Sequence, residues 1–185
     1  MVDRKRAENA VRELLAAIGE DSSREGLRET PERVARMLEE LTAGYADRAE
    51  EHLGKTFAES GSALVIERDI AFSSTCEHHL MPFFGRVHIA YVPDGKVAGL
   101  SKLARTVEVY ARRLQLQERM NAQIADAIYR HLAPKGVAVA VEAEHTCMTA
   151  RGVKKTGSST VTYAVRGEIS DGVVAQLLSY TGERK

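Results

Sequence analysis

Apolar residues in the first 50 positions recur at the three- and four-residue spacing that is typical of amphipathic helices. One set precedes Gly19 and consists of Val11, Leu14, Leu15 and Ile18. The second set follows Thr30-Pro31 and consists of Val34, Met37, Leu38 and Leu41. Threonine is a favoured N-cap and proline a favoured first-turn residue, so the second helix is predicted to begin there and to end by Gly44. Both helices need a surface that covers their apolar faces.

From residue 63 the apolar period changes to the two-residue alternation of half-buried strands. Strands are predicted over 63–68, 86–92, from 137 to the segment His145-Thr146-Cys147, and over 160–165. Helices are predicted over 102–114, with Ser101 as the cap, over 118–132, and over 173–178. This order predicts an α+β fold with an antiparallel four-stranded sheet and two helices on one face. We divide the chain into an N-terminal helical region, residues 1–60, and a second domain, residues 61–185.

The charge balance narrows the function classes. The chain has 185 residues, with 26 Lys and Arg against 26 Asp and Glu, and 5% aromatic residues without tryptophan. Such a chain is not expected to be a basic nucleic-acid or membrane-surface protein, or to read RNA by stacking. No apolar run approaches the roughly 20 residues of a membrane helix, and no secretory-type apolar core follows the first residues. We therefore expect a cytoplasmic protein with neither nucleic acid nor a membrane as partner.

The two cysteines, Cys76 and Cys147, are too few for a disulfide scaffold. Cys76 and His79 have a C-x-x-H spacing, which lets a turn direct a thiolate and an imidazole at one metal ion. Cys147 could supply a third ligand, and a catalytic zinc site with three protein ligands keeps its fourth position for water. His78 and His145 would then be free for acid-base chemistry. Two alternatives stay open, namely buried core thiols with surface histidines, and a disulfide between the two cysteines.

Charge is unevenly distributed along the chain. Residues 1–52 carry 9 basic and 13 acidic side chains, whereas residues 53–185 carry 17 and 13. In the second part, one basic set without acidic neighbours consists of Arg151, Lys154, Lys155 and Arg166. A second set stands at a predicted helix start and consists of Ser101, Lys102 and Arg105. Together they favour a phosphate-bearing ligand, although charge runs are more often solvated faces, and neither the P-loop nor the dinucleotide fingerprint is present.

Gln117-Glu118 stands at another predicted helix start. A carboxylate beside an amide can read the N–H and carbonyl edge of a purine. The alternative, which these two residues alone favour, is that Glu118 stabilises the helix dipole in the first turn.

Four segments taken together, in their order and spacing, resemble GTP cyclohydrolase I. They are Cys-Glu-His-His at 76–79, Gly-Leu-Ser-Lys-Leu-Ala-Arg at 99–105, Gln-Glu-Arg at 117–119 and His-Thr-Cys-Met-Thr-Ala-Arg-Gly-Val at 145–153. The resemblance covers about residues 5–180. It implies a tunnelling fold, with residues 61–185 as the catalytic domain, and a homodecamer of two pentameric rings. It also implies the family's reaction, in which GTP and water give formate and 7,8-dihydroneopterin triphosphate for tetrahydrofolate or other pterin synthesis.

The resemblance also implies roles for individual residues. The cofactor Zn²⁺ would be held by Cys76, His79 and Cys147. Catalytic roles fall on His78, His145 and Ser101. Contacts with the substrate GTP fall on Gln117, Glu118, Lys102, Arg105, Arg151 and Arg33, and the last of these would be lent by another subunit.

Two other functions compete with this interpretation. The related tunnelling-fold nitrile reductase of queuosine synthesis uses a cysteine nucleophile and a nicotinamide cofactor, and the paired Cys-Glu-His-His and His-Thr-Cys motifs argue against it. A structural zinc protein that binds a nucleotide without turnover would need a fourth protein ligand to the metal and would hold no exchangeable water.

Overall fold

The computed structural model describes residues 2–61 and 63–182. In chain order its helices are α1 (Arg4–Ala17), α2 (Thr30–Leu41), α3 (Ala49–Leu53), α4 (Leu100–Ala111), α5 (Gln117–Leu132), α6 (Thr146–Thr149) and α7 (Asp171–Ser179), with a 3-10 turn η1 over Ala43–Tyr45. The strands are β1 (Thr56–Ala58), β2 (Val65–Cys76), β3 (Pro82–Val92), β4 (Lys96–Ala98), β5 (Leu114–Gln115), β6 (Gly136–His145) and β7 (Thr160–Gly167). The predicted α+β class is confirmed, and both N-terminal helices are present.

The main sheet has five strands in the order β5-β2-β3-β6-β7, so the predicted four-stranded sheet is wrong by one strand. The four long strands are antiparallel to one another. The fifth, β5, is only two residues long and runs parallel to the end of β2, with Cys76 opposite Gln115. Two residues carry no periodic signal, so this strand cannot be read from the chain. A separate pair is formed by β1 and β4.

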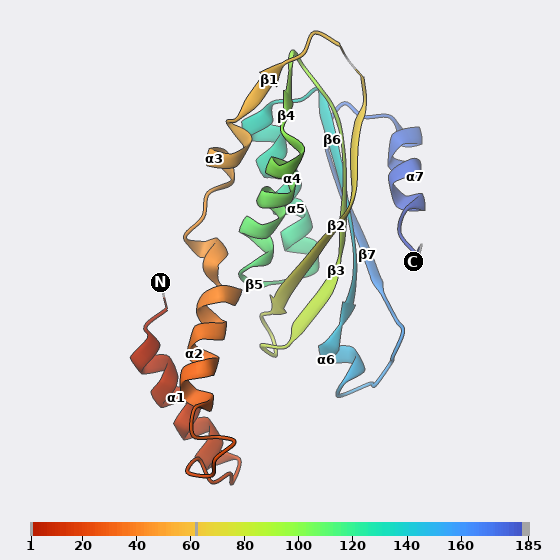
Figure 1. Ribbon diagram of the computed structural model, residues 1–185. Helices are drawn as coiled ribbons and strands as arrows, with labels where there is room; N and C mark the ends of the chain where they lie inside the picture. Colours follow the sequence, from red (N-terminus) through yellow and green to blue (C-terminus); the bar gives the residue numbers. More distant parts are fainter. Residues whose placement is uncertain (1, 62, 183–185) are drawn as a thin grey trace.

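Both faces of this sheet are covered by helices. On one face, alternate residues of β3 and β6, including Ile89, Val139 and Val141, are fully buried in one apolar cluster with residues of α4 and α5. On the other face, Ala90, Ala138 and Ala140 pack with Leu177 of α7. Figure 1 shows α4 and α5 on one side of the sheet and α7 on the other. The two helices predicted on one face are therefore α4 and α5, and α7 covers the other face, where alanines leave room for it.

The strand β2 extends to Cys76, beyond the end predicted at residue 68. Its register with β3 shifts between Glu67 and Ile70, and Asp69 has a φ of 61°. This irregularity resembles a β-bulge, which interrupts the alternation of side chains. The two-residue apolar period therefore does not show that the strand continues. The continuation matters because it carries Cys76 to the end of the sheet.

Two predicted helix starts are shifted. The N-cap of α4 is Gly99, whose backbone is extended with φ −61° and ψ 134°, so Ser101 lies inside the first turn and is not the cap. The N-cap position of α2 is Glu29, and Thr30 is the first helical residue, followed by Pro31. The shift of α4 leaves Ser101 and Lys102 in the first turn of the helix.

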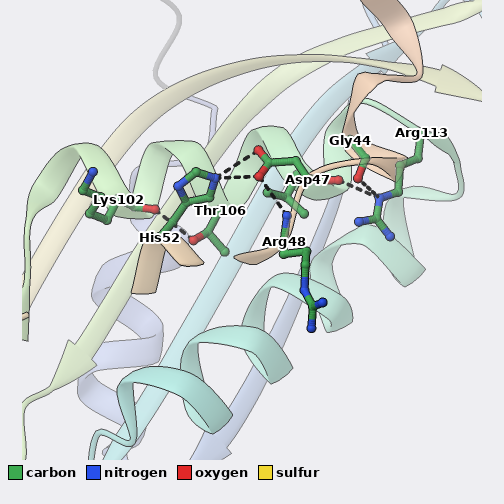
Figure 2. Close-up of polar contacts among 8 residues, drawn as sticks. Gly44, Asp47, Arg48, His52, Lys102, Thr106 and Arg113 are labelled. Atoms are coloured by element: carbon green, nitrogen blue, oxygen red, sulfur yellow. Dashed lines mark hydrogen bonds and ion pairs between the residues drawn. The ribbon is translucent and has the colours of Figure 1, made fainter. Parts of the chain in front are cut away.

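The N-terminal helical region is joined to α4 by close backbone contact at Gly44. The Gly44 N–H donates to Arg112 O at 3.0 Å, and a Cβ on Gly44 would lie 2.3 Å from Val109 O. The Arg113 guanidinium donates to Gly44 O at 3.1 Å (Figure 2). Gly44 is therefore needed for this approach and does not end the second helix, which stops at Leu41.

Among the described helices, none has both the length and the apolar character that crossing a bilayer requires.

Replacing Gly85 by alanine is expected to disturb the centre of the sheet. A Cβ on Gly85 of β3 would lie 1.9 Å from Glu142 O and 2.8 Å from the Ala143 Cα, both in the neighbouring strand β6. Because this backbone cannot move without breaking strand pairing, we expect Gly85→Ala to lower the free energy of unfolding by about 1–3 kcal/mol. Urea denaturation at fixed protein concentration measures it.

The matched control is Gly172→Ala in the first turn of α7. A Cβ there would meet only Ser170 Oγ at 3.9 Å, and alanine is the better helix former by up to about 1 kcal/mol. This variant should unfold at the wild-type urea concentration or above it. A Gly85→Ala variant as stable as Gly172→Ala would contradict the proposed clash.

Candidate functional site

A tight turn at the end of the β2–β3 hairpin presents the Cys-Glu-His-His segment. Cys76 is the last residue of β2 and is buried, and its N–H donates to Met81 O at 2.8 Å. Leu80, which takes a positive φ of 53°, donates its N–H to Cys76 O at 2.9 Å and closes the turn. The turn points His79 back toward Cys76, with 3.9 Å between Nδ1 and Sγ.

Cys147 reaches the same place from the end of β6. Phe83, near the start of β3, pairs with His145, so the end of β6 lies beside the hairpin turn. The strand stops at His145, and Thr146–Thr149 form one helical turn, α6. The prediction that the strand continues to Cys147 is therefore corrected, because Cys147 is positioned by a helical turn. The result is that ligand atoms of Cys76, His79 and Cys147 all lie within 4.8 Å of one another.

The electrostatics of this trio suit a cation. Burial, and then the neighbouring Cys76 sulfur, raises the pKa of the Cys147 thiol. Two adjacent thiols that oppose each other's ionisation are stabilised as thiolates by a metal ion between them. The trio could therefore hold a metal ion. Arg151, predicted as a phosphate contact, lies beside it, with Nη1 2.8 Å from His79 Nε2.

A cavity of about 200 Å³ adjoins the two cysteines and also contains the predicted acid-base and guanine-reading residues. It is lined in part by His78, Gln117, Glu118 and His145. The short strand β5 explains why Gln117 and Glu118 lie in the same cavity as the cysteines, because pairing Gln115 with Cys76 places the start of α5 beside the end of β2. This cavity is the candidate functional site.

His145 is held firmly in the wall of this cavity. Its ring stacks on Phe83, with centroids 4.8 Å apart and planes 12° apart. Burial lowers the pKa of His145, and the charge of Glu118 partly opposes that shift. A neutral ring near pH 7 can accept a proton and return it.

One contact at the site had no signal in the sequence. Arg119 of α5 donates from Nη1 to Glu77 Oε2 at 2.5 Å and from Nη2 to Glu77 Oε1 at 2.9 Å. This two-pronged ion pair ties the turn between Cys76 and His79 to the helix that carries Glu118. The partners stand 42 positions apart, and only the folded chain reveals that they meet.

Other predicted site residues lie away from the cavity within one chain. Ser101, Lys102 and Arg105 lie in the first half of α4, and its far end leads to β5 at the cavity (Figure 1). Because α4 has 12 residues, it is about 18 Å long, and this length separates its first turn from the cavity. Arg33 lies on α2, where it pairs with Glu29 at 2.6 Å on the surface.

The surroundings of Lys102 are polar (Figure 2). The Thr106 hydroxyl donates to Lys102 O at 2.8 Å. His52 Nε2 lies 2.9 Å from Asp47 Oδ1, and Asp47, His52 and Arg105 line a cavity of about 270 Å³. Burial, the largest single cause, acts to raise the pKa of the Asp47 carboxyl, but the hydrogen bonds from His52 and the Arg48 N–H, with the charges of His52 and Arg105, together outweigh it and keep that pKa below its usual value.

Fold and site together define a class, namely an α+β chain whose sheet carries a group able to hold a metal ion beside two histidines in one cavity. The sequence model of the family described as GTP cyclohydrolase I matches residues 7–179. The chain belongs to the GTP cyclohydrolase I family.

Relatives from several bacteria agree with this membership. The chain is 58% identical over 166 residues to a protein named GTP cyclohydrolase 1 from Clostridium kluyveri, covering 90% of each chain. It is 56% identical to a protein of the same name from Streptococcus sanguinis, covering 91% of this chain and 92% of the relative. Among solved structures it is similar to an archaeosine synthase QueF-Like, with 20% identity and a TM-score of 0.49 over 60% of this chain and 100% of that one.

Removing Cys147 is expected to abolish tight metal binding. Cys147→Ala leaves two of the three clustered ligand atoms. Losing a residue that only supports a metal ligand costs up to about 100-fold in metal affinity. Losing a ligand itself should therefore weaken Zn²⁺ binding by more than about 100-fold. Competition with a chelator, followed by elemental analysis, measures the affinity. The matched control, His131→Ala, removes an exposed histidine at the end of α5 and should keep wild-type affinity. Unchanged affinity in Cys147→Ala would exclude this trio as the metal site.

Proposed function

We propose that this chain catalyses the GTP cyclohydrolase I reaction, in which GTP and water give formate and 7,8-dihydroneopterin triphosphate. This is the first step of tetrahydrofolate or other pterin synthesis. The observation that carries the proposal is one cavity in which Cys76 and Cys147 adjoin His78, His145 and Glu118. Family membership and relatives named for this activity support it.

Zn²⁺ is the cofactor that this donor set suits, since thiolate and imidazole are its usual ligands. Cys76, His79 and Cys147 would hold it, and three protein ligands leave one position open. When bound, Zn²⁺ supplies Lewis-acid activation of water at neutral pH.

The chain's own residues bind the purine and move protons around it. The Glu118 carboxylate accepts hydrogen bonds from the N–H edge of guanine and thereby orients the imidazole part of the base. His145 exchanges a proton with N7 of the purine, because burial keeps its ring neutral near pH 7. His78, on the exposed side of the cavity, serves the second proton transfer, and Phe83 helps to keep water from the His145 ring.

The triphosphate is bound by Ser101, Lys102, Arg105, Arg151 and Arg33, and Ser101 also assists the rearrangement of the ribose. Within one chain most of these residues lie away from the cavity, so we assign them to neighbouring subunits of a homodecamer built from two pentameric rings. The edge strand β7 supports such an assembly, because Val161 and Tyr163 on it are 44% and 59% exposed. Residues 61–185 would form the tunnelling-fold catalytic domain, and residues 1–60 the helical region that lends Arg33. We place the enzyme in the cytoplasm.

Turnover of GTP tests the proposal directly. Zn²⁺-loaded protein incubated with GTP should release one formate for each dihydroneopterin triphosphate, measured with a formate dehydrogenase couple and by pterin fluorescence after oxidation. Cys147→Ala protein serves as the metal-deficient control and should produce neither. Absence of both products with the Zn²⁺-loaded wild type would end the proposal, and NADPH oxidation with a deazaguanine nitrile would favour the nitrile reductase.

Glu118 is expected to determine the choice of base. Glu118→Gln replaces an acceptor of two N–H groups by an amide, so kcat/KM for GTP should fall by about 10- to 100-fold. Inosine triphosphate lacks the 2-amino group, and the wild-type preference for GTP over it should shrink in the variant. Glu13→Gln, on the exposed side of α1, is the matched control and should retain both values. An undiminished preference in Glu118→Gln would show that another group reads the base.

A further inference from the structure

Gln117, the first residue of α5, is 1% exposed and has its amide nitrogen bound by the sheet. Nε2 lies 3.0 Å from Val141 O, 2.9 Å from Thr160 O and 3.2 Å from Thr162 Oγ1. Backbone carbonyl oxygens only accept hydrogen bonds, so they require the NH₂ group of the amide on their side. Residues of β6 and β7 thus determine which way the Gln117 amide faces.

The amide oxygen must then face His145. Gln117 Oε1 lies 2.8 Å from His145 Nε2, and an amide oxygen can only accept, so Nε2 carries the proton. In the neutral ring this leaves the lone pair on Nδ1, which has no hydrogen-bond partner among the described residues. Stacking on Phe83 determines the ring plane, and the Gln117 bond determines the rotation within that plane.

The geometry points to Gln117 as a positioning residue that holds the catalytic histidine in one tautomer and one orientation. Val141 and Thr160 set the amide, the amide sets the proton of His145, and Nδ1 is left to exchange a proton with the substrate. This inference rests on the proposed function. The contact of Gln117 with GTP stays a separate prediction, and the positioning role is carried by the bonds that both polar atoms of its side chain make to protein.

Few side chains could replace glutamine at position 117. Glutamate would set a carboxylate oxygen against the carbonyls of Val141 and Thr160, and asparagine is one methylene too short to span from those carbonyls to His145. Methionine has a similar length and volume but neither donates nor accepts strongly. Gln117→Met therefore removes the hydrogen bonds while largely preserving the packing.

A double-mutant cycle separates positioning from substrate binding. Gln117→Met should lower kcat for GTP by about 100-fold, with a KM change below about threefold, because a misplaced catalytic group costs roughly that factor. In the His145→Ala background the same substitution should change kcat by less than about twofold, since residues that act as a unit are not additive. The matched control, Gln176→Met on the exposed side of α7, should keep the wild-type kcat. Equal losses in both backgrounds, or a raised KM with kcat retained, would overturn the inference.

The tautomer of His145 gives a readout that needs neither turnover nor a folded variant. Nitrogen-15 shifts of His145 in Zn²⁺-loaded wild-type protein at pH 8.5 should show a protonated Nε2 and an unprotonated Nδ1. The opposite tautomer overturns the inference by itself. If neither the wild type nor any variant turns over GTP, the proposed function fails, but this measurement still decides the role of Gln117.

Discussion

Ten consecutive residues of β3 pair with β6, from Phe83 opposite His145 to Val92 opposite Gly136. Side chains alternate across a strand, so a slip of one residue would turn Val139 and Val141 away from α5 and bring alanines into their place. The same slip would move His145 off Phe83 and carry Cys147 away from the hairpin turn. The apolar core and the candidate site thus depend on one register, and burial of the valines is the main force that holds it.

The site lies where three parts of that framework meet. They are the hairpin turn before β3, the end of β6 at His145, and the start of α5 after β5. Two-pronged pairing of Arg119 with Glu77 and the buried amide of Gln117 join these ends by polar contacts. Polar contacts in partly buried surroundings are geometrically demanding, which gives the side chains around the cavity defined orientations.

Much of the fold could be predicted from the order of periodic segments, because each long strand and helix has its own apolar face. Failures occurred where the local pattern is interrupted or too short. The irregularity at Asp69 hid residues 69–76 of β2, and two residues of β5 gave no period at all. Cys147 was expected on a strand, yet a single helical turn carries it. The trio of ligand types was nonetheless identified, since cysteine and histidine are rare in this chain and each stood out.

Local chemistry along the chain was therefore decided by the sequence alone: which residues could ligate a metal, which carry positive charge, and which long segments with an unbroken apolar period fold as helices or strands. These properties depend on side-chain type and on neighbours within about one turn. Tertiary structure alone decided that Gln117 bonds to His145, that Arg119 reaches Glu77, and that α7 covers the second face of the sheet. Each of these results from packing between segments far apart in the chain, where burial and register, and no local preference, set the geometry.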